Sequence, residues 1–226
     1  MKKIDLLLSN LPAWVPYVVP IIAFIGLTSL ESAMPKSAYV WLYCSKVMVV
    51  TILLLSFRRP WRDIRPQMKG LLPAVVVGLV VFAEWILIDK WVPYPHLGDR
   101  VGFNPNAEIA VPLLRLCFTL VRFYGLVILV PIMEELFWRS FLLRYLSNTD
   151  DFTQIPIGSF TGSAFGIVAI AFALAHPEWL VAAICAAAYA LLLKQTRSIF
   201  ACIFAHSITN LALGLYVILA QDWIYW

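Results

Sequence analysis

Several ionisable residues that could do chemistry lie inside stretches that are otherwise apolar. The segment 131–139 reads PIMEELFWR and holds two adjacent carboxyl groups and an arginine. On a helix, Glu135 and Arg139 are four residues apart and share a face, whereas Glu134 is turned about 100° away from Glu135. One carboxylate can therefore pair with Arg139 while the other faces elsewhere. Two acids held apart in this way can take different roles in a reaction.

Two of the three histidines also lie in or beside apolar runs. His176 closes the segment FALAH, and His206 has Asn210 one helical turn further on, on the same face. The third, His96, lies in a proline-rich polar loop and is expected at the surface. A charged group at the centre of a spanning helix costs about 2.5–3.5 kcal/mol, so such residues persist mainly where they face a bundle interior or a water-filled cavity.

A structural explanation exists for each residue taken alone. Glu135 and Arg139 could form only a stabilising ion pair at the end of a span. A single buried histidine is more often a core residue with satisfied hydrogen bonds than a catalytic group. Taken together, the acidic pair, the two histidines and the asparagine carry a joint desolvation penalty, which favours a shared polar site.

The elements that must position these residues are membrane-spanning helices. Of 226 residues, 62% are hydrophobic and 13% are charged, against about 25% charged in an ordinary soluble domain. This composition excludes a soluble enzyme, a nucleic-acid-binding domain and a disordered chain. We expect one all-α, polytopic transmembrane helical bundle over residues 1–226, with N-terminal spans in 1–108 and the core spans that carry the ionisable residues in 109–226.

The apolar runs predict seven spans, because each span needs about 20 apolar residues. The runs cover residues 13–30, 38–57, 71–88, 109–145, 160–176, 179–193 and 199–220. The fourth run is too long for one simple span. It is expected to hold a short interfacial helix and then a long span from about Leu120, and dividing it into two spans would give eight.

Basic residues predict the orientation in the membrane, because basic loops stay in the cytoplasm. One loop has a single acid, Asp63, and five basic residues: Arg58, Arg59, Arg62, Arg65 and Lys69. With this loop inside, the N-terminus with Lys2 and Lys3 is cytoplasmic and, after seven spans, the C-terminus is outside. Other basic residues fall at cytoplasmic ends, namely Arg139, Arg144, Lys194 and Arg197, whereas Arg115 and Arg122 fall toward the outer side and count against this orientation.

Distances along the helices suggest that the polar residues can meet. Glu134 lies about 15 Å from the cytoplasmic end of its span, and His206 about 13 Å from the end of its own. The arm 179–193 is only about 22 Å long, against about 30 Å of hydrocarbon. The turn at His176 and Pro177 is therefore expected within the membrane, where polar backbone requires protein cover or a wet cavity. We hypothesise that these helices enclose a water-accessible pocket.

The order of the motifs also resembles a known family. Glu134-Glu135-xxx-Arg139, Phe172-xxx-His176 and His206-xxx-Asn210 follow one another on successive membrane segments. They look like the motifs of the CPBP family of intramembrane glutamic proteases, which includes type II CAAX prenyl endopeptidases and bacteriocin-immunity proteins. The resemblance covers roughly residues 120–213. The sequence around these motifs is similar to a bacterial CAAX prenyl protease-related branch that is associated with exosortase protein sorting.

The resemblance implies a helical bundle with a conical cavity and peptide hydrolysis without a metal or other cofactor. Glu134 would match the catalytic glutamate and His176 the histidine that helps it to activate a water. His206 and Asn210 would match the pair that stabilises the oxyanion. The remaining two motif residues, Glu135 and Arg139, would support the site.

The resemblance further implies a multi-pass protein of the cell inner (plasma) membrane, in contact with the lipid bilayer. Its substrate would be a membrane-anchored protein or peptide cut near its C-terminus, with an exosortase-system protein as one candidate. The residue types suit this chemistry, because a desolvated glutamate suits a base and an imidazole with an amide can form an oxyanion hole. The chain has no GxSxG nucleophile elbow.

Three other functions remain open. Two histidines and a glutamate could form the three-ligand site of a zinc-dependent intramembrane protease, although the chain has no HExxH motif. The same bundle could serve as a non-catalytic membrane chaperone or bacteriocin-immunity-type partner, because a shared fold does not fix function. Intramembrane acids and histidines also occur in transporters, although no inverted repeat is visible here.

Overall fold

The computed structural model describes residues 11–98 and 100–226. Within these ranges the chain is helical and has no β-strand, as expected for an all-α protein. The α-helices are α2 (Val15–Ala33), α3 (Tyr39–Ser56), α4 (Leu71–Trp91), α5 (Pro105–Glu108), α6 (Pro112–Tyr124), α7 (Val130–Glu134), α8 (Leu143–Tyr145), α9 (Gly162–Leu174), α10 (Trp179–Thr196) and α11 (Ile199–Ala220).

The lengths of these helices make the chain a multi-pass membrane protein. In the described part of the chain, six helices are long and apolar enough to cross a membrane: Val15–Ala33, Lys36–Ser56, Met68–Trp91, Pro112–Tyr145, Trp179–Thr196 and Ile199–Ala220. A seventh apolar helix, α9, has 13 residues and so measures about 20 Å, less than the hydrocarbon thickness of about 30 Å. Residues 175–178, which follow α9, are not helical, as predicted for the turn that carries His176.

The fourth apolar run folds differently from the prediction. It forms one continuous helix of 34 residues, Pro112–Tyr145, and not an interfacial helix followed by a span from Leu120. Two of its segments are π-helical, η4 (Gly125–Leu129) and η5 (Glu135–Leu142). Pro131 lies in the first turn of α7, between them. Proline has no N–H to donate and clashes with the preceding turn, and a locally wider coil relieves both problems without ending the helix.

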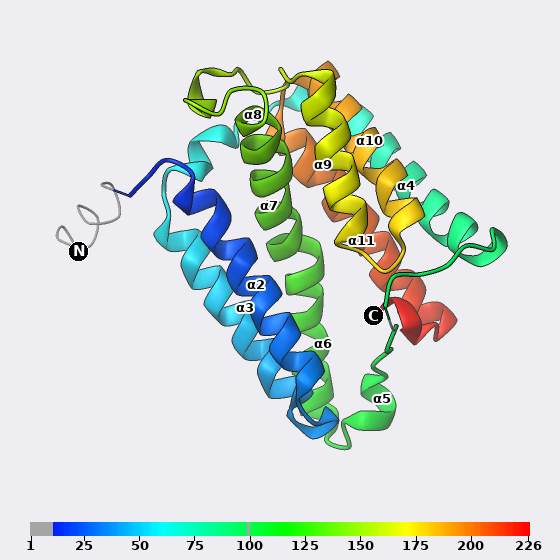
Figure 1. Cartoon of the computed structure of the whole chain (residues 1–226). Helices are drawn as coiled ribbons and strands as arrows, with labels where there is room; N and C mark the ends of the chain where they lie inside the picture. Colours follow the sequence, from blue (N-terminus) through cyan, green and yellow to red (C-terminus); the bar gives the residue numbers. More distant parts are fainter. Residues whose placement is uncertain (1–10, 99) are drawn as a thin grey trace.

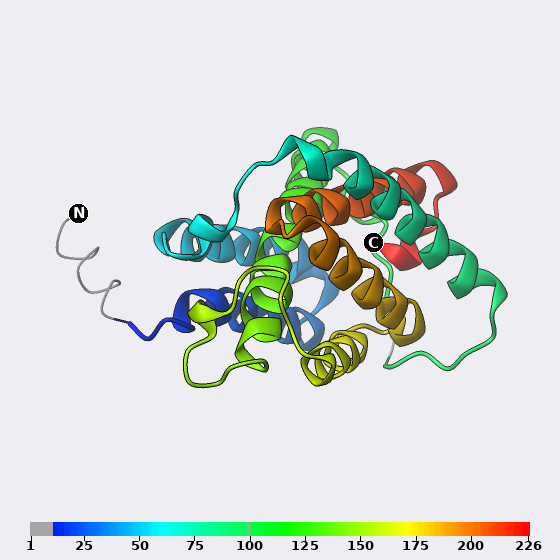
Figure 2. The ribbon, with the colours of Figure 1, turned by 90° about the horizontal axis from the view of Figure 1, so that it is seen from above.

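This long helix is the axis of the molecule. Figure 1 shows it in green between the pair α2 and α3 on one side and the group α4, α9, α10 and α11 on the other, and the view from above in Figure 2 shows the same division. A helix of this length measures about 51 Å, well beyond the hydrocarbon thickness. It therefore runs from one end of the bundle to the other and contacts both groups.

Helices α4 and α11 pack side by side and run in the same direction. Three contacts along them define the register: Gly70 with Ala201 and Gly78 with Ala205, then Lys90 with Tyr216. At the second contact the backbones approach closely, because a Cβ built on Gly78 would lie 2.5 Å from the backbone oxygen of Ala205. The Thr209 hydroxyl donates to the Gly78 carbonyl oxygen at 2.7 Å. The glycine thus permits the close packing of these two helices.

We expect Gly78→Ala to lower the free energy of unfolding by about 1–3 kcal/mol, the usual range for overpacking. The added methyl group would meet backbone at 2.5 Å and the Ile208 Cβ at 3.0 Å, so the helices must separate. Thermal unfolding in mild detergent measures the loss. Gly166→Ala in α9 is the matched control, because a Cβ there has nothing within 4 Å. Equal unfolding temperatures for the two variants would show that the close approach at Gly78 does not matter.

The basic loop after α3 is fixed to the end of the long helix by its one acid. The Asp63 Oδ2 atom accepts hydrogen bonds from Tyr17 Oη at 2.8 Å, Ser140 Oγ at 2.6 Å and Arg144 Nη2 at 2.7 Å. This places the basic loop and Arg144 at the same end of the bundle, and the side of the membrane that this end faces stays a prediction. Lys2 and Lys3, on which that prediction also depends, lie outside the described residues.

Candidate active site

The centre of the site is a fully buried carboxylate, Glu135, at the start of η5. Its exposed fraction is 0%, and that of Arg139 is 1%. Arg139 Nη1 donates to Glu135 Oε1 at 3.1 Å, which is the pairing that the four-residue spacing predicted. His206 Nδ1, on α11, lies 2.9 Å from the same oxygen. Two of the three sequence motifs, 71 residues apart in the chain, therefore meet at one atom.

Aromatic rings hold the arginine in this position. The Arg139 guanidinium carbon lies 4.6 Å from the ring centre of Phe172 and 5.3 Å from that of Tyr189. The Tyr189 hydroxyl is hydrogen-bonded to Thr209 Oγ1 at 2.7 Å. Stacking on aromatic faces suits a planar, weakly hydrated guanidinium in a dry environment. Helices α9, α10 and α11 thus all contribute to the support of the Glu135–Arg139 pair.

His176 lies in the turn after α9, beside the same phenylalanine. Its Nδ1 atom lies 2.8 Å from the Phe172 carbonyl oxygen, and because a carbonyl only accepts, Nδ1 carries the hydrogen. The neutral ring then has its lone pair on Nε2. The ring centre lies 4.5 Å from that of Phe172 and 5.9 Å from that of Trp85 on α4. Phe172 contacts both His176 and Arg139, so the second motif is joined to the first through this ring.

Asn210 connects α11 to the long helix. Its Nδ2 atom donates to the carbonyl oxygen of Leu126 at 2.8 Å, within η4. This bond uses one of the two amide hydrogens and leaves the other, with the side-chain oxygen, for further partners. Asn210 lies one turn beyond His206, as the spacing predicted.

Glu134 has surroundings different from those of its neighbour. It is partly buried, and its Oε2 atom is out of contact with solvent and has no hydrogen-bond partner. Glu135 is engaged by a cation and an imidazole, whereas Glu134 has a free acceptor oxygen. This contrast matches the division that the sequence suggested for the two adjacent acids.

One residue near the site had no predicted role. Glu84, on α4, has both carboxyl oxygens out of contact with solvent and without a hydrogen-bond partner in the described chain. Its neighbour Trp85 contacts the His176 ring. The signal was present in the sequence, because Glu84 interrupts the apolar run 71–88 and carries the same insertion penalty as the motif residues.

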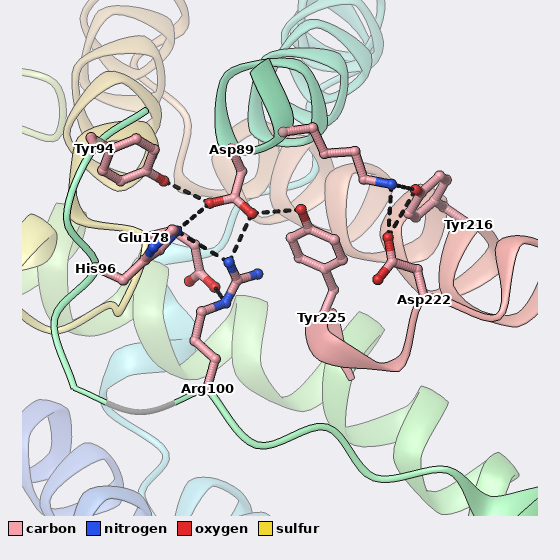
Figure 3. A network of polar contacts seen from close by, with 9 residues as sticks. Asp89, Tyr94, His96, Arg100, Glu178, Tyr216, Asp222 and Tyr225 are labelled. Atoms are coloured by element: carbon pink, nitrogen blue, oxygen red, sulfur yellow. Dashed lines mark hydrogen bonds and ion pairs between the residues drawn. The ribbon is translucent and has the colours of Figure 1, made fainter. Parts of the chain in front are cut away.

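A polar network lies beside the turn that carries His176, at the end of α4 away from the basic loop (Figure 3). The Asp89 carboxylate is hydrogen-bonded to Tyr94 Oη at 2.8 Å, His96 Nε2 at 2.7 Å, Arg100 Nη1 at 2.9 Å and Tyr225 Oη at 2.5 Å. Burial and the Asp89 carboxylate raise the pKa of Tyr94 and of Tyr225, so both phenols stay protonated and donate. The His96 side chain is 29% exposed, in keeping with the expected surface loop, and its hydrogen-bond partners are the nearby Asp89 and Arg100.

Arg100 extends this network to the turn that carries His176. Its Nε atom lies 2.8 Å from Glu178 Oε1, two residues after His176. The backbone N–H of Leu97 donates to the Pro177 carbonyl oxygen at 2.9 Å, and Trp179 Nε1 donates to the Pro95 carbonyl oxygen at 2.7 Å. The loop after α4 thus holds the turn on both sides of Glu178. Among the described residues, no group of three or more His, Cys, Asp or Glu side chains is arranged to hold a metal ion.

The comparisons with known proteins concern the part of the chain that contains the three motifs. Residues 115–212 match the family model of type II CAAX prenyl endopeptidase Rce1-like proteins. No curated protein and no solved structure matches the chain significantly. The matched residues include η4, η5 and His206 with Asn210, but not Glu84 on α4.

Proposed function

We propose that this protein is an intramembrane glutamic endopeptidase, because residues 115–212 match the family model of Rce1-like type II CAAX prenyl endopeptidases. Its substrate is a membrane-attached protein cut near the C-terminus. The observation that supports this most is the meeting of Arg139 and His206 at one oxygen of Glu135. This contact joins the first and third motifs into one site and leaves the adjacent Glu134 without such partners.

In this proposal Glu134 is the general base. It takes a proton from a water molecule as the water oxygen bonds to the scissile carbonyl carbon. His176, with Nδ1–H bound to the Phe172 carbonyl oxygen, offers Nε2 to the same water and orients it. General bases placed in this way contribute about 10²–10⁴ to a rate.

His206 and Asn210 are the donors for the oxyanion. The Nδ1 atom of His206 faces Glu135, so its Nε2 atom carries a hydrogen when the ring is protonated, and the Glu135 carboxylate is the counter-ion for that form. Asn210 has one amide hydrogen beyond the bond to Leu126. Donors that are already fixed in place stabilise developing negative charge in a site that excludes water. Glu135 and Arg139 hold this arrangement and do not touch the substrate.

The proposal includes a place in the cell and a substrate class. The catalytic core covers residues 109–226, and the N-terminal spans lie in 1–108. We place the protein in the inner (plasma) membrane with its N-terminus in the cytoplasm, since the basic loop and Arg144 lie at one end of the bundle. The similarity of the motif region to an exosortase-associated branch makes a protein of that sorting system the first substrate to test.

Mass spectrometry of protein C-termini tests the function directly. Membranes that contain the wild-type chain are expected to show new C-termini on membrane-attached proteins that membranes without the chain lack. The new termini should persist when EDTA is present, because the proposed water activation uses Glu134 and His176. Activity that EDTA abolishes and zinc restores would favour a metalloprotease, and identical C-termini with and without the chain would favour a non-catalytic partner.

A further inference from the structure

Glu84 is an intramembrane carboxyl group for which the mechanism above has no use. Both of its oxygens are buried, and neither has a hydrogen-bond partner in the described chain. A buried polar group without a partner is costly, and an unpaired buried charge is more so. In contrast to Glu135, which has Arg139 as counter-ion, Glu84 has no ion pair within the described residues. The neutral acid avoids an unpaired charge, and its O–H needs an acceptor from water or substrate.

The register between α4 and α11 places this group at the level of the proposed oxyanion donors. Gly78 lies beside Ala205, and Lys90 lies beside Tyr216. Glu84 is halfway between the two contacts on α4, six residues or about 9 Å beyond the first. Because the two helices are parallel, the corresponding position on α11 is that of Asn210 or the next residue.

The residue next to Glu84 contacts one of the motif residues. The next residue on α4, Trp85, contacts the His176 ring. Glu84 therefore lies on the helix that contacts the His176 ring, and a buried acid within a span is by default a candidate for function.

On the basis of the proposed function, we propose that Glu84 is a further catalytic residue, the proton donor to the leaving amine. Glu134 accepts the water proton while the water oxygen bonds to the carbonyl carbon. The carbon–nitrogen bond then breaks, and the nitrogen takes the Glu84 proton. Glu134 returns its proton to Glu84 through bound water. The cycle consumes one water and one amide bond and restores both carboxyl groups.

The test compares Glu84→Gln and Glu84→Asp with the exposed-acid control Glu108→Gln. The substrate is a peptide with the cleavage site found by mass spectrometry, made as the amide and as an aryl ester. We expect Glu84→Gln to lower kcat for the amide by about 10²–10⁴ with little change in KM, and to lower it far less for the ester, whose leaving group needs no proton. Glu84→Asp should recover part of the amide rate, and Glu108→Gln should match the wild type.

Several results would overturn the assignment. Wild-type amide hydrolysis by Glu84→Gln, or equal losses on amide and ester, excludes a proton donor. If Glu84→Gln cleaves both compounds at the wild-type rate while Glu134→Gln cleaves neither, only the inference about Glu84 fails. If the wild type cleaves neither compound, the proposed function fails as well. Infrared spectroscopy of the folded protein needs no substrate. The carboxylic-acid C=O band must weaken in Glu84→Gln but not in Glu108→Gln, and an unchanged band excludes a neutral Glu84.

Discussion

Glu134→Gln is expected to lower kcat by about 10²–10⁴ without preventing membrane insertion or folding. The substitution keeps the shape of the side chain and removes its ability to accept the water proton. It leaves the ion pair between Glu135 and Arg139 and the hydrogen bond from His206 unchanged, because these use the neighbouring carboxylate. Release of the C-terminal fragment from a reconstituted peptide substrate measures the rate.

The control for this variant is again Glu108→Gln, which removes one negative charge at an exposed position. It should cleave at the wild-type rate. Both variants should unfold at the wild-type temperature in mild detergent. Wild-type turnover in Glu134→Gln would remove the proposed general base and with it the glutamic mechanism.

Arg139→Met is expected to destabilise the fold by about 3–5 kcal/mol, the usual cost when one partner of a buried ion pair is lost. The arginine is the only guanidinium bound to the buried Glu135 carboxylate in the described chain. Without it, the carboxylate keeps only the His206 ring as partner at 2.9 Å. Thermal unfolding in mild detergent, followed by circular dichroism, measures the difference.

A double variant separates the loss of charge balance from the loss of packing. Glu135→Gln combined with Arg139→Met removes both charges and should recover most of the stability, because methionine can still contact the Phe172 ring. If Arg139→Met is as stable as the wild type, the pair contributes nothing to the fold. If the double variant is no better than the single one, packing and not charge explains the loss.

The bounds of helices such as α4 and α11 were predictable, because their apolar runs begin and end at clear polar boundaries. The run 199–220 coincides with α11, and the run 71–88 differs from α4 only by a last turn that contains Asp89. The prediction for the run 109–145 was wrong because it divided the run on length alone, whereas the helix Pro112–Tyr145 continues through Gly125 and Pro131. In a membrane helix such residues are tolerated where neighbouring helices and local π-type turns satisfy the backbone.

The candidate site was predictable within one helix and not between helices. The Glu135–Arg139 pair follows from four-residue spacing, whereas the contact of Glu135 with His206 depends on how α11 packs against the long helix. The network beside His96 joins Asp89 to Tyr225 and Arg100 to Glu178, and no local pattern connects these pairs. The catalytic roles of Glu134, His176, His206 and Asn210 stay predictions, as does the conical cavity that the family resemblance implied.

The π-helical coil η5 has a consequence for how this region tolerates changes in length. Glu135 at its beginning faces α11, while Ser140 within it and Arg144 just beyond it reach Asp63. A π-type turn holds about one residue more than an α-type turn. The contact with α11 and the contact with Asp63 are therefore rotated relative to each other about the helix axis by a different angle than in a regular α-helix. Deleting one residue between Glu135 and Ser140 would turn the far contact by about 100° relative to the near one. The number of residues between Glu135 and Ser140 therefore sets the rotation between the Glu135–His206 contact and the contacts with Asp63. An insertion or deletion in this segment would disturb both contacts.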